Sequence, residues 1–318
     1  MTTPLLLNAR AAQVVETMIA RADLLRITSH EIDGGGRYLD CGIQTRGGLA
    51  AGLDLARVCL GDLAEVRLGS GELAGRETPL VLVWSDHAVQ ACLAGQYAGW
   101  AISEGKYFAM GSGPMRAVRG KEHIYDLIGF REECGTVVGV LETRKAPPPE
   151  VVAKIAAECG VEPWNVTLLA APTASLAGGV QIVSRSVETA LHKLAELKFD
   201  LTRIVSAQGV APLPPVARED MAAIGRTNDA ILYGARVLLH VTGDDESIAE
   251  VGPRVPSSGS HDFGEPFAAI FARYNHDFYA VDPHLFSPAE VAFQNLETGR
   301  THVFGSPRPE IVARSFWE

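Results

Sequence analysis

Apolar positions along the chain alternate between helical spacing and extended spacing. A first helix is predicted from Asn8 to about Leu25, with Asn8 as its cap, because apolar residues recur there every three or four positions. Further helices are predicted over residues 48–60, 86–96, 151–159 and 218–225. Strands are predicted over residues 38–43, 65–68, 80–84, 135–142, 165–171, 201–206, 236–242, 291–295 and 301–304, the last two as a hairpin. This alternation predicts the α/β class with α+β elements.

The length of 318 residues exceeds the size at which one hydrophobic core keeps growing. We therefore expect either two domains or one large layered domain, and two domains would leave a cleft between the lobes. The proline-rich segment 146–150 is a stiff link between a strand and a helix, and it predicts an approximate boundary. The predicted domains are residues 1–148 and 149–318, and segments exchanged between the two remain possible.

A helix is also predicted over residues 181–194, which read QIVSRSVETALHKL. Its apolar positions gather on one face of a helical wheel, whereas Arg185, Glu188 and His192 gather on the other. An arginine and a glutamate three residues apart are ordinarily a solvated surface pair. The alternative is that they line a pocket, and the helical pattern alone does not choose between the two.

Charge and composition narrow the class of partner. The formal net charge of −10 argues against a nucleic acid or an anionic membrane, since both require a basic surface, and favours a small molecule. Apolar runs such as residues 79–84 are too short to cross a bilayer, and no basic leader with a long apolar core precedes the first helix. Five cysteines stand singly, which is typical of reduced residues and predicts the cytoplasm.

Two segments concentrate polar chemistry between glycines. Gly111, Ser112 and Gly113 form a turn whose backbone amides could cup an anion beside Arg116, although a plain tight turn is the ordinary interpretation. Residues 225–236 carry Asn228 and Asp229, which either cap a helix or read the donor and acceptor edge of a flat heterocycle.

Two His-Asp pairs, His261-Asp262 and His276-Asp277, raise the question of a metal site. Metal-dependent hydrolases with such pairs need further ligands at helical spacing, and neither pair has them in the sequence. We therefore expect no metal, while a metal-dependent hydrolase stays an alternative.

Six long stretches of the chain are similar to one known family. Taken together they resemble the methenyltetrahydromethanopterin cyclohydrolase family over nearly the whole chain. The stretches are RGGLAAG (46–52), ACLAGQYAGW (91–100), YFAMGSGPMRA (107–117), PTASLAGGVQIVSRSVETALHK (172–193), GRTNDAILYG (225–234) and DFYAVDPHLFSPAEV (277–291).

The resemblance implies a hydrolase that uses neither a metal nor a redox cofactor and that assembles as a homotrimer. It also implies two α/β domains with a deep substrate cleft between them. The implied reaction opens the cyclic amidinium of 5,10-methenyltetrahydromethanopterin to give the 5-formyl product, with Arg185 and Glu188 as the catalytic residues. A pterin-binding protein without activity is a second alternative, and a folate-type substrate is not excluded. The residues expected to bind the substrate, whose tail is anionic, are Lys106, Gly111, Ser112, Gly113, Arg116, Gln181, Arg226, Asn228 and Asp229.

Overall fold

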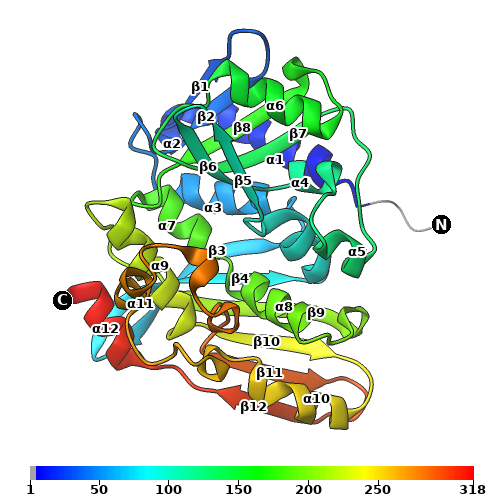
Figure 1. Ribbon diagram of the computed structural model, residues 1–318, viewed down its shortest axis with the longest axis vertical. Coiled ribbons are helices and arrows are strands. Elements are labelled where there is room, and N and C mark those ends of the chain that lie inside the picture. Colours follow the sequence, from blue (N-terminus) through cyan, green and yellow to red (C-terminus); the bar gives the residue numbers. More distant parts are fainter. Residues whose placement is uncertain (1–4) are drawn as a thin grey trace. The chain divides into compact units, whose positions relative to one another are not determined.

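The computed structural model describes residues 5–318, which form two compact units, each built around a six-stranded sheet (Figure 1). The first unit comprises the described residues up to Ala64 together with Gln90–Gln181, and the second comprises Glu65–Val89 and Ile182–Glu318. The mixed α/β class is confirmed.

The division between the units differs from the boundary predicted at residues 148/149. The proline-rich segment lies inside the first unit, because it joins two neighbouring parallel strands of the same sheet through helix α6. Pro149 is the first residue of α6, a position at which the missing N–H of proline costs nothing. The hairpin of residues 65–85, in contrast, belongs to the second unit although it lies in the N-terminal part of the sequence. It pairs there with strand β9 (Ile204–Pro212).

The first sheet has the strand order β1-β2-β8-β7-β6-β5. Strands β2, β8 and β7 are mutually parallel, whereas the other pairings are antiparallel. The strands are β1 (Thr28–Glu31), β2 (Arg37–Asp40), β5 (Trp100–Glu104), β6 (Tyr107–Ser112), β7 (Val137–Glu142) and β8 (Val166–Ala171). The helices of this unit are α1 (Leu7–Ala20), α2 (Ala22–Leu25), α3 (Leu49–Cys59), the π-helix η1 (Val89–Gln96), α4 (Met115–Arg119), α5 (Ile124–Ile128), α6 (Pro149–Cys159), η2 (Pro163–Asn165) and α7 (Leu176–Val183), of which η1 and α7 cross between the units.

Both faces of the first sheet are buried. One core contains Val138 and Leu169 and is completed by residues of α1 and α3. The other core contains Leu141 and Leu168 and is completed by residues of α6. Strand β7 therefore reads as a continuous apolar run, as expected of a strand covered on both sides.

The second sheet has the strand order β12-β11-β10-β9-β4-β3, and only the β10–β11 pair is parallel. The strands are β3 (Glu65–Leu73), β4 (Arg76–Ser85), β9 (Ile204–Pro212), β10 (Arg236–Val241), β11 (Glu290–Asn295) and β12 (Thr301–Gly305). The helices are α8 (Ser186–Glu196), η3 (Leu201–Arg203), α9 (Asp220–Leu232), α10 (Asp245–Val251), η4 (Gly252–Arg254), η5 (Ser257–Gly259), α11 (Phe267–Arg273), η6 (Phe278–Ala280), η7 (Pro283–Leu285) and α12 (Pro309–Trp317).

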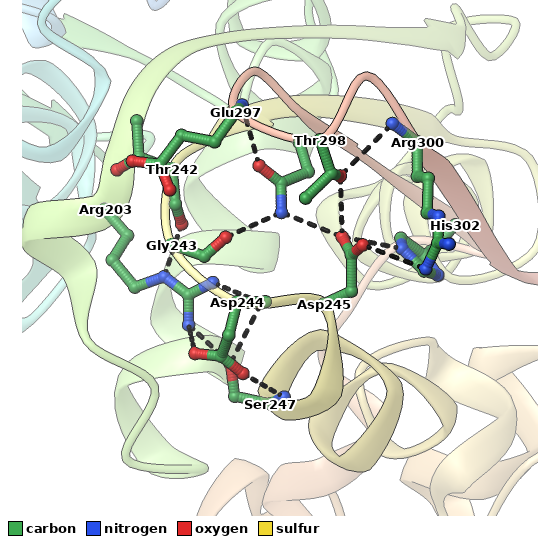
Figure 2. A network of polar contacts seen from close by, with 11 residues as sticks. Arg203, Thr242, Gly243, Asp244, Asp245, Ser247, Glu297, Thr298, Arg300 and His302 are labelled. Atoms are coloured by element: carbon green, nitrogen blue, oxygen red, sulfur yellow. Dashed lines mark hydrogen bonds and ion pairs between the residues drawn. The ribbon is translucent and has the colours of Figure 1, made fainter.

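The predicted C-terminal hairpin is confirmed as β11 and β12, and its turn is anchored to the start of α10 (Figure 2). Asp245 accepts hydrogen bonds from Asn295 Nδ2 at 2.8 Å and from Thr298 Oγ1 at 3.1 Å. His302 Nε2 lies 3.1 Å from the same carboxylate. Arg203 holds the neighbouring loop by donating to the carbonyl oxygens of Thr242 and Asp244. This network fixes one end of the second sheet.

The helix predicted from Asn8 to Leu25 begins one residue earlier and is broken at Arg21. Asn8 is not its cap. The Asn8 side chain lies in the core, where it donates to the Pro114 carbonyl and to Glu132, and accepts from the Val138 N–H at 2.9 Å. Within residues 5–318, no helix is long and apolar enough to span a membrane.

Candidate active site

The helix predicted over residues 181–194 is interrupted at its middle. Helix α7 ends at Val183 and α8 begins at Ser186, with Arg185 as the residue that caps α8. The backbone nevertheless stays hydrogen-bonded through the break, because the Arg185 N–H donates to Ile182 and the Arg185 carbonyl accepts from Thr189. The break places Arg185 at the junction of the two helices and Glu188 in the first turn of α8.

Arg185 and Glu188 are both buried, with exposed fractions of 8% and 4%. A solvated surface pair is therefore excluded. The opposite face of α8 is buried as well, through Val187, Leu191 and Leu194. A buried guanidinium and a buried carboxylate lose their hydration, which costs free energy. Proteins retain such groups where an opposite charge compensates them or where they take part in binding or catalysis.

The first turn of α8 lies unusually close to the second sheet, and Gly209 of β9 allows this approach. A Cβ atom at position 209 would lie 2.4 Å from Ser186 Oγ and 3.0 Å from Val187 Cγ2. Gly209 pairs with Val83 on one side and Val237 on the other, so it sits inside the sheet. The sheet thus sets the position of Glu188, whose negative charge is also favoured at the N-terminus of a helix. The strand predicted from the sequence ends at residue 206, whereas β9 continues to Pro212, so the close approach at Gly209 was not predicted.

Arg116 has a structural role that the sequence analysis did not predict. Its side chain is completely buried and hydrogen-bonds the carbonyls of Leu93 and Gly95 near the end of the π-helix η1. Its Nε donates to Glu122 at 3.2 Å, and the rings of Tyr97 and Tyr125 lie beside the guanidinium. This geometry differs from the predicted exposed anion ligand, because the donors of Arg116 point into the protein.

The glycine turn before Arg116 is also part of the core. The Gly113 N–H donates to the Gly95 carbonyl at 2.8 Å, so it does not face an anion. Gly111 pairs with strands on both sides, and the Ser112 hydroxyl lies in the interior 3.4 Å from the Val140 carbonyl. Gly111 and Ser112 therefore end strand β6, and only Gly113 lies in the bend that follows, so the tight turn is limited to Gly113 and these contacts do not fit the predicted anion cup.

Residues 225–232 of the segment 225–234 form the C-terminal part of α9 (Asp220–Leu232), and the last two residues lie in the turn that follows. Asn228 donates back to the Ile224 carbonyl at 2.9 Å, which is a contact within the helix.

Asp229 is fully buried and accepts a hydrogen bond from the Phe267 N–H at 2.8 Å, so it caps α11. Burial raises the pKa of Asp229 to about 7, although hydrogen bonds from Ser315 and from Phe267 act in the opposite direction. Arg226 joins α9 to its surroundings through the carbonyls of Ser315 and Pro215. These contacts give Asn228 and Asp229 structural roles, and their recognition of a heterocycle stays a prediction.

Two predicted substrate ligands remain in the first unit. Lys106 is exposed in the tight turn between β5 and β6, and its carbonyl accepts a hydrogen bond from Lys145 Nζ at 3.0 Å. Two lysines therefore meet at this turn. Gln181 is buried in α7, and its amide lies 3.3 Å from Cys59 Sγ.

Lys193 is a buried cation that the sequence analysis missed, because a lysine on an amphipathic helix is normally solvated. It lies on α8, five residues after Glu188, and its Nζ donates to the His284 carbonyl at 2.6 Å. Burial lowers the pKa of Lys193 to about 8, an effect that Asp282 partly opposes. The lysine attaches the middle of the 277–291 segment to the helix that carries the candidate catalytic pair.

Both His-Asp pairs lie in the second unit, where Asp262 is buried and the other three side chains are exposed. His261 Nδ1 is 3.0 Å from Asp282, and Asp277 accepts a hydrogen bond from the Tyr279 N–H. His276 packs edge-on against the ring of Phe271. Among the residues that the structure describes, no group of three or more His, Cys, Asp and Glu side chains is arranged to hold a metal ion.

The comparisons with known proteins cover nearly the whole chain. The family described as Cyclohydrolase (MCH) matches residues 6–316. The methenyltetrahydromethanopterin cyclohydrolase of Rhodopirellula baltica is 50% identical over 290 residues, which cover 89% of this chain and 86% of that protein. The protein of the same name from a Methylobacterium species is 44% identical, with 97% of both chains covered. That of Methanosphaerula palustris is 42% identical, with 97% of this chain and 98% of the relative covered. The chain therefore belongs to the Cyclohydrolase (MCH) family.

Proposed function

We propose that this chain hydrolyses the cyclic amidinium of 5,10-methenyltetrahydromethanopterin to 5-formyltetrahydromethanopterin, with Arg185 and Glu188 as the catalytic residues. The observation that carries the proposal is the burial of this arginine and glutamate at the start of one helix, in a chain of the cyclohydrolase family. The relatives named above carry the name of this activity, which supports the same reaction here.

The chemistry needs few catalytic groups. The carbon to be attacked bridges two nitrogens and shares their positive charge, so the substrate is itself activated toward water. A Lewis acid adds little to such an electrophile, and we propose that neither a metal nor a redox cofactor takes part. The enzyme has to place a water molecule, remove its proton during the attack, and return a proton to the nitrogen that leaves.

Glu188 can perform both proton transfers in turn. Its carboxylate accepts the proton as the water oxygen bonds to the bridging carbon, and then delivers it to the leaving nitrogen. The same residue thus acts first as the base and then as the acid. The second proton of the water molecule is released when the hydroxyl on the bridging carbon becomes the formyl oxygen, so each turnover converts the cationic substrate into a neutral product and one free proton. Glu188 then has its starting charge again.

Arg185 serves to keep Glu188 ionised and oriented. A nearby guanidinium favours the charged form of a carboxylate and so makes it a weaker base. A weak base is sufficient here, because water becomes more acidic as it bonds to a cationic carbon. The first turn of α8 and the close contact at Gly209 hold the pair in one orientation.

The anionic tail of the substrate requires a local positive region on a chain of net charge −10. Arg116 and the Gly111–Gly113 turn lie in the core, so we assign this role to Lys106, with Lys145 beside it. The cleft expected between the two domains stays a prediction, as do assembly as a homotrimer and a cytoplasmic location. Gln181 remains a candidate ligand of the pterin.

The reaction can be tested by following the loss of absorbance of the methenyl substrate with purified protein. The expected result is turnover of the methanopterin-type substrate that exceeds turnover of the folate-type substrate and the spontaneous rate. A sample treated with a chelator and passed over a desalting column should keep its activity. Loss of activity in the chelator arm that returns with a divalent metal would favour the metal-dependent hydrolase, and substrate binding without turnover would favour an inactive paralogue.

A further inference from the structure

Glu188 is only 4% exposed, yet the proposed reaction produces a proton beside it that has to reach the solvent in every turnover. The attacking water brings two protons to the site, and one of them goes to the nitrogen that leaves. The other is lost as the hydroxyl on the bridging carbon becomes the formyl oxygen. Glu188 is ionised again at that stage, so it is the base that meets this proton. A buried carboxylate then needs a second acceptor that reaches water.

His192 stands one helical turn after Glu188. Both residues lie within α8, four positions apart, so their side chains share one face of the helix with Cβ atoms about 5–6 Å apart. Side chains of a helix lean toward its N-terminus, and this direction brings the ring of His192 over the turn that carries Glu188. His192 is half-buried, whereas Glu188 is buried. The histidine therefore links the interior position of the carboxylate to the surface.

The other charged side chains of α8 and its N-terminal junction are poorly suited to carry this proton. Arg185 stays protonated in a protein, so it cannot accept one. Lys193 is already bonded to the carbonyl oxygen of His284 at 2.6 Å. Glu196 lies two turns beyond Glu188, at the exposed end of the helix. His192 is therefore the side chain of this helix that suits a proton transfer from Glu188.

The elements packed against α8 present uncharged side chains to it or hold their charges elsewhere. Arg203 of η3 donates to the carbonyl oxygens of Thr242 and Asp244. Asp282 and Arg254 lie near Lys193. The buried residues of β4, β9 and β10 on the face beneath α8 are Val81, Val83, Ser85, Ala207, Gly209, Ala211, Val237, Leu239 and Val241. A histidine changes its charge between about pH 5 and pH 8, so it can take up a proton and release it within one turnover.

We propose that His192 carries the released proton from Glu188 to the solvent. The inference rests on the proposed function. As the bond to the leaving nitrogen breaks, that nitrogen keeps the bonding electron pair, and the hydroxyl on the bridging carbon gives its proton to a carboxylate oxygen of Glu188. The proton then passes to a ring nitrogen of neutral His192. The imidazolium delivers it to water or buffer, which returns both side chains to their starting charge. In this role His192 acts through Glu188.

The test separates the first turnover from the turnovers that follow. His192→Gln keeps a polar side chain but cannot carry a proton. Because the first turnover needs no earlier release, rapid mixing should show a burst of one substrate molecule per site at the wild-type rate. Steady-state kcat should then fall at least about tenfold, and KM should fall in parallel, so that kcat/KM is nearly unchanged. The matched control is His240→Gln, a half-buried histidine on β10, which should keep both constants.

Chemical rescue distinguishes a proton carrier from a side chain that only fills space. His192→Ala opens room beside Glu188, and added imidazole should restore most of the lost kcat. Pyrazole has a ring of the same size that is hardly basic near neutral pH, so it should restore none. Circular dichroism and thermal melting check that His192→Gln and His192→Ala are folded, and either variant suffices for the test.

A folded His192→Gln protein with the wild-type kcat would overturn the relay. So would a lowered kcat/KM without a burst, or equal rescue by imidazole and pyrazole, since both results indicate a structural role. A wild-type protein that binds the methenyl substrate without turning it over would refute the proposed function itself, and the relay with it. Wild-type turnover together with an unaffected His192→Gln variant refutes the relay alone.

Discussion

The buried carboxylate of Asp229 in α9 accepts a hydrogen bond of 2.8 Å from the backbone N–H of Phe267, the first residue of α11. Two helices far apart in the sequence are therefore joined through one side chain. Because the pKa of Asp229 is raised by burial, its charged form is disfavoured in the folded protein. The cap should therefore link stability to pH.

We expect the free energy of unfolding to fall as the pH rises from about 4 to about 7. A carboxyl group with a raised pKa in the folded state contributes most below its unfolded pKa, and its contribution is lost as the pH rises through the folded value of about 7. The slope from one such group approaches about 1.4 kcal/mol per pH unit. Asp229→Asn keeps an oxygen for the Phe267 N–H but cannot ionise, so urea unfolding should show a flatter profile. An unchanged profile would contradict the assignment, and Asp220→Asn on the same helix is the control.

Gly209→Ala should displace the first turn of α8. The added Cβ would meet Ser186 Oγ at 2.4 Å inside the sheet, and overpacking of this kind costs about 1–3 kcal/mol. We expect lower thermal stability together with a reduced rate of turnover, since Arg185 and Glu188 move with the turn. Gly135→Ala is the control, because nothing lies within 4 Å of a Cβ at that position.

The contact at Gly209 can be tested further with a double variant. Ser186→Ala removes the hydroxyl that the new Cβ would meet, so Gly209→Ala/Ser186→Ala should regain part of the lost stability and activity. Full activity in the single Gly209→Ala variant would show that the close approach does not position the catalytic pair.

Arg116→Ala should destabilise the protein rather than weaken substrate binding selectively. The substitution leaves the Leu93 and Gly95 carbonyls without their donor and Glu122 without its buried partner, and breaking a buried pair costs about 3–5 kcal/mol. Thermal melting should show the loss, with exposed Arg218→Ala as the control. A stable variant with a raised and salt-dependent KM would instead support the anion-binding role predicted from the sequence.

The sequence predicts most elements of the fold because their apolar patterns are local. The helix at 49–59, the strand at 137–142 and the C-terminal hairpin all follow from spacing that the buried faces of the structure confirm. The division of the chain into two units, in contrast, does not follow from the local spacing of apolar residues. Strand β4 joins β9 across more than a hundred residues, and no local pattern encodes that pairing.

The candidate site, like the division into units, is only partly predictable from the sequence. The sequence identifies Arg185 and Glu188 through spacing and resemblance, and their burial confirms that the pair does not face bulk water. The sequence does not predict the break between α7 and α8, because the residues on both sides suit a helix. Nor does it distinguish Arg116, whose partners are main-chain carbonyls, from an arginine that binds a ligand.

The role of Glu188 is tested most directly by measuring turnover of the methenyl substrate with Glu188→Gln. Glu196→Gln, an exposed position at the end of the same helix, is the matched control. The account predicts that Glu188→Gln lowers kcat by about 10²–10⁴-fold, the range typical of general acid–base catalysis, while substrate binding and the control are nearly unchanged. A Glu188→Gln protein that turns over substrate within about twofold of the wild-type rate would contradict the account.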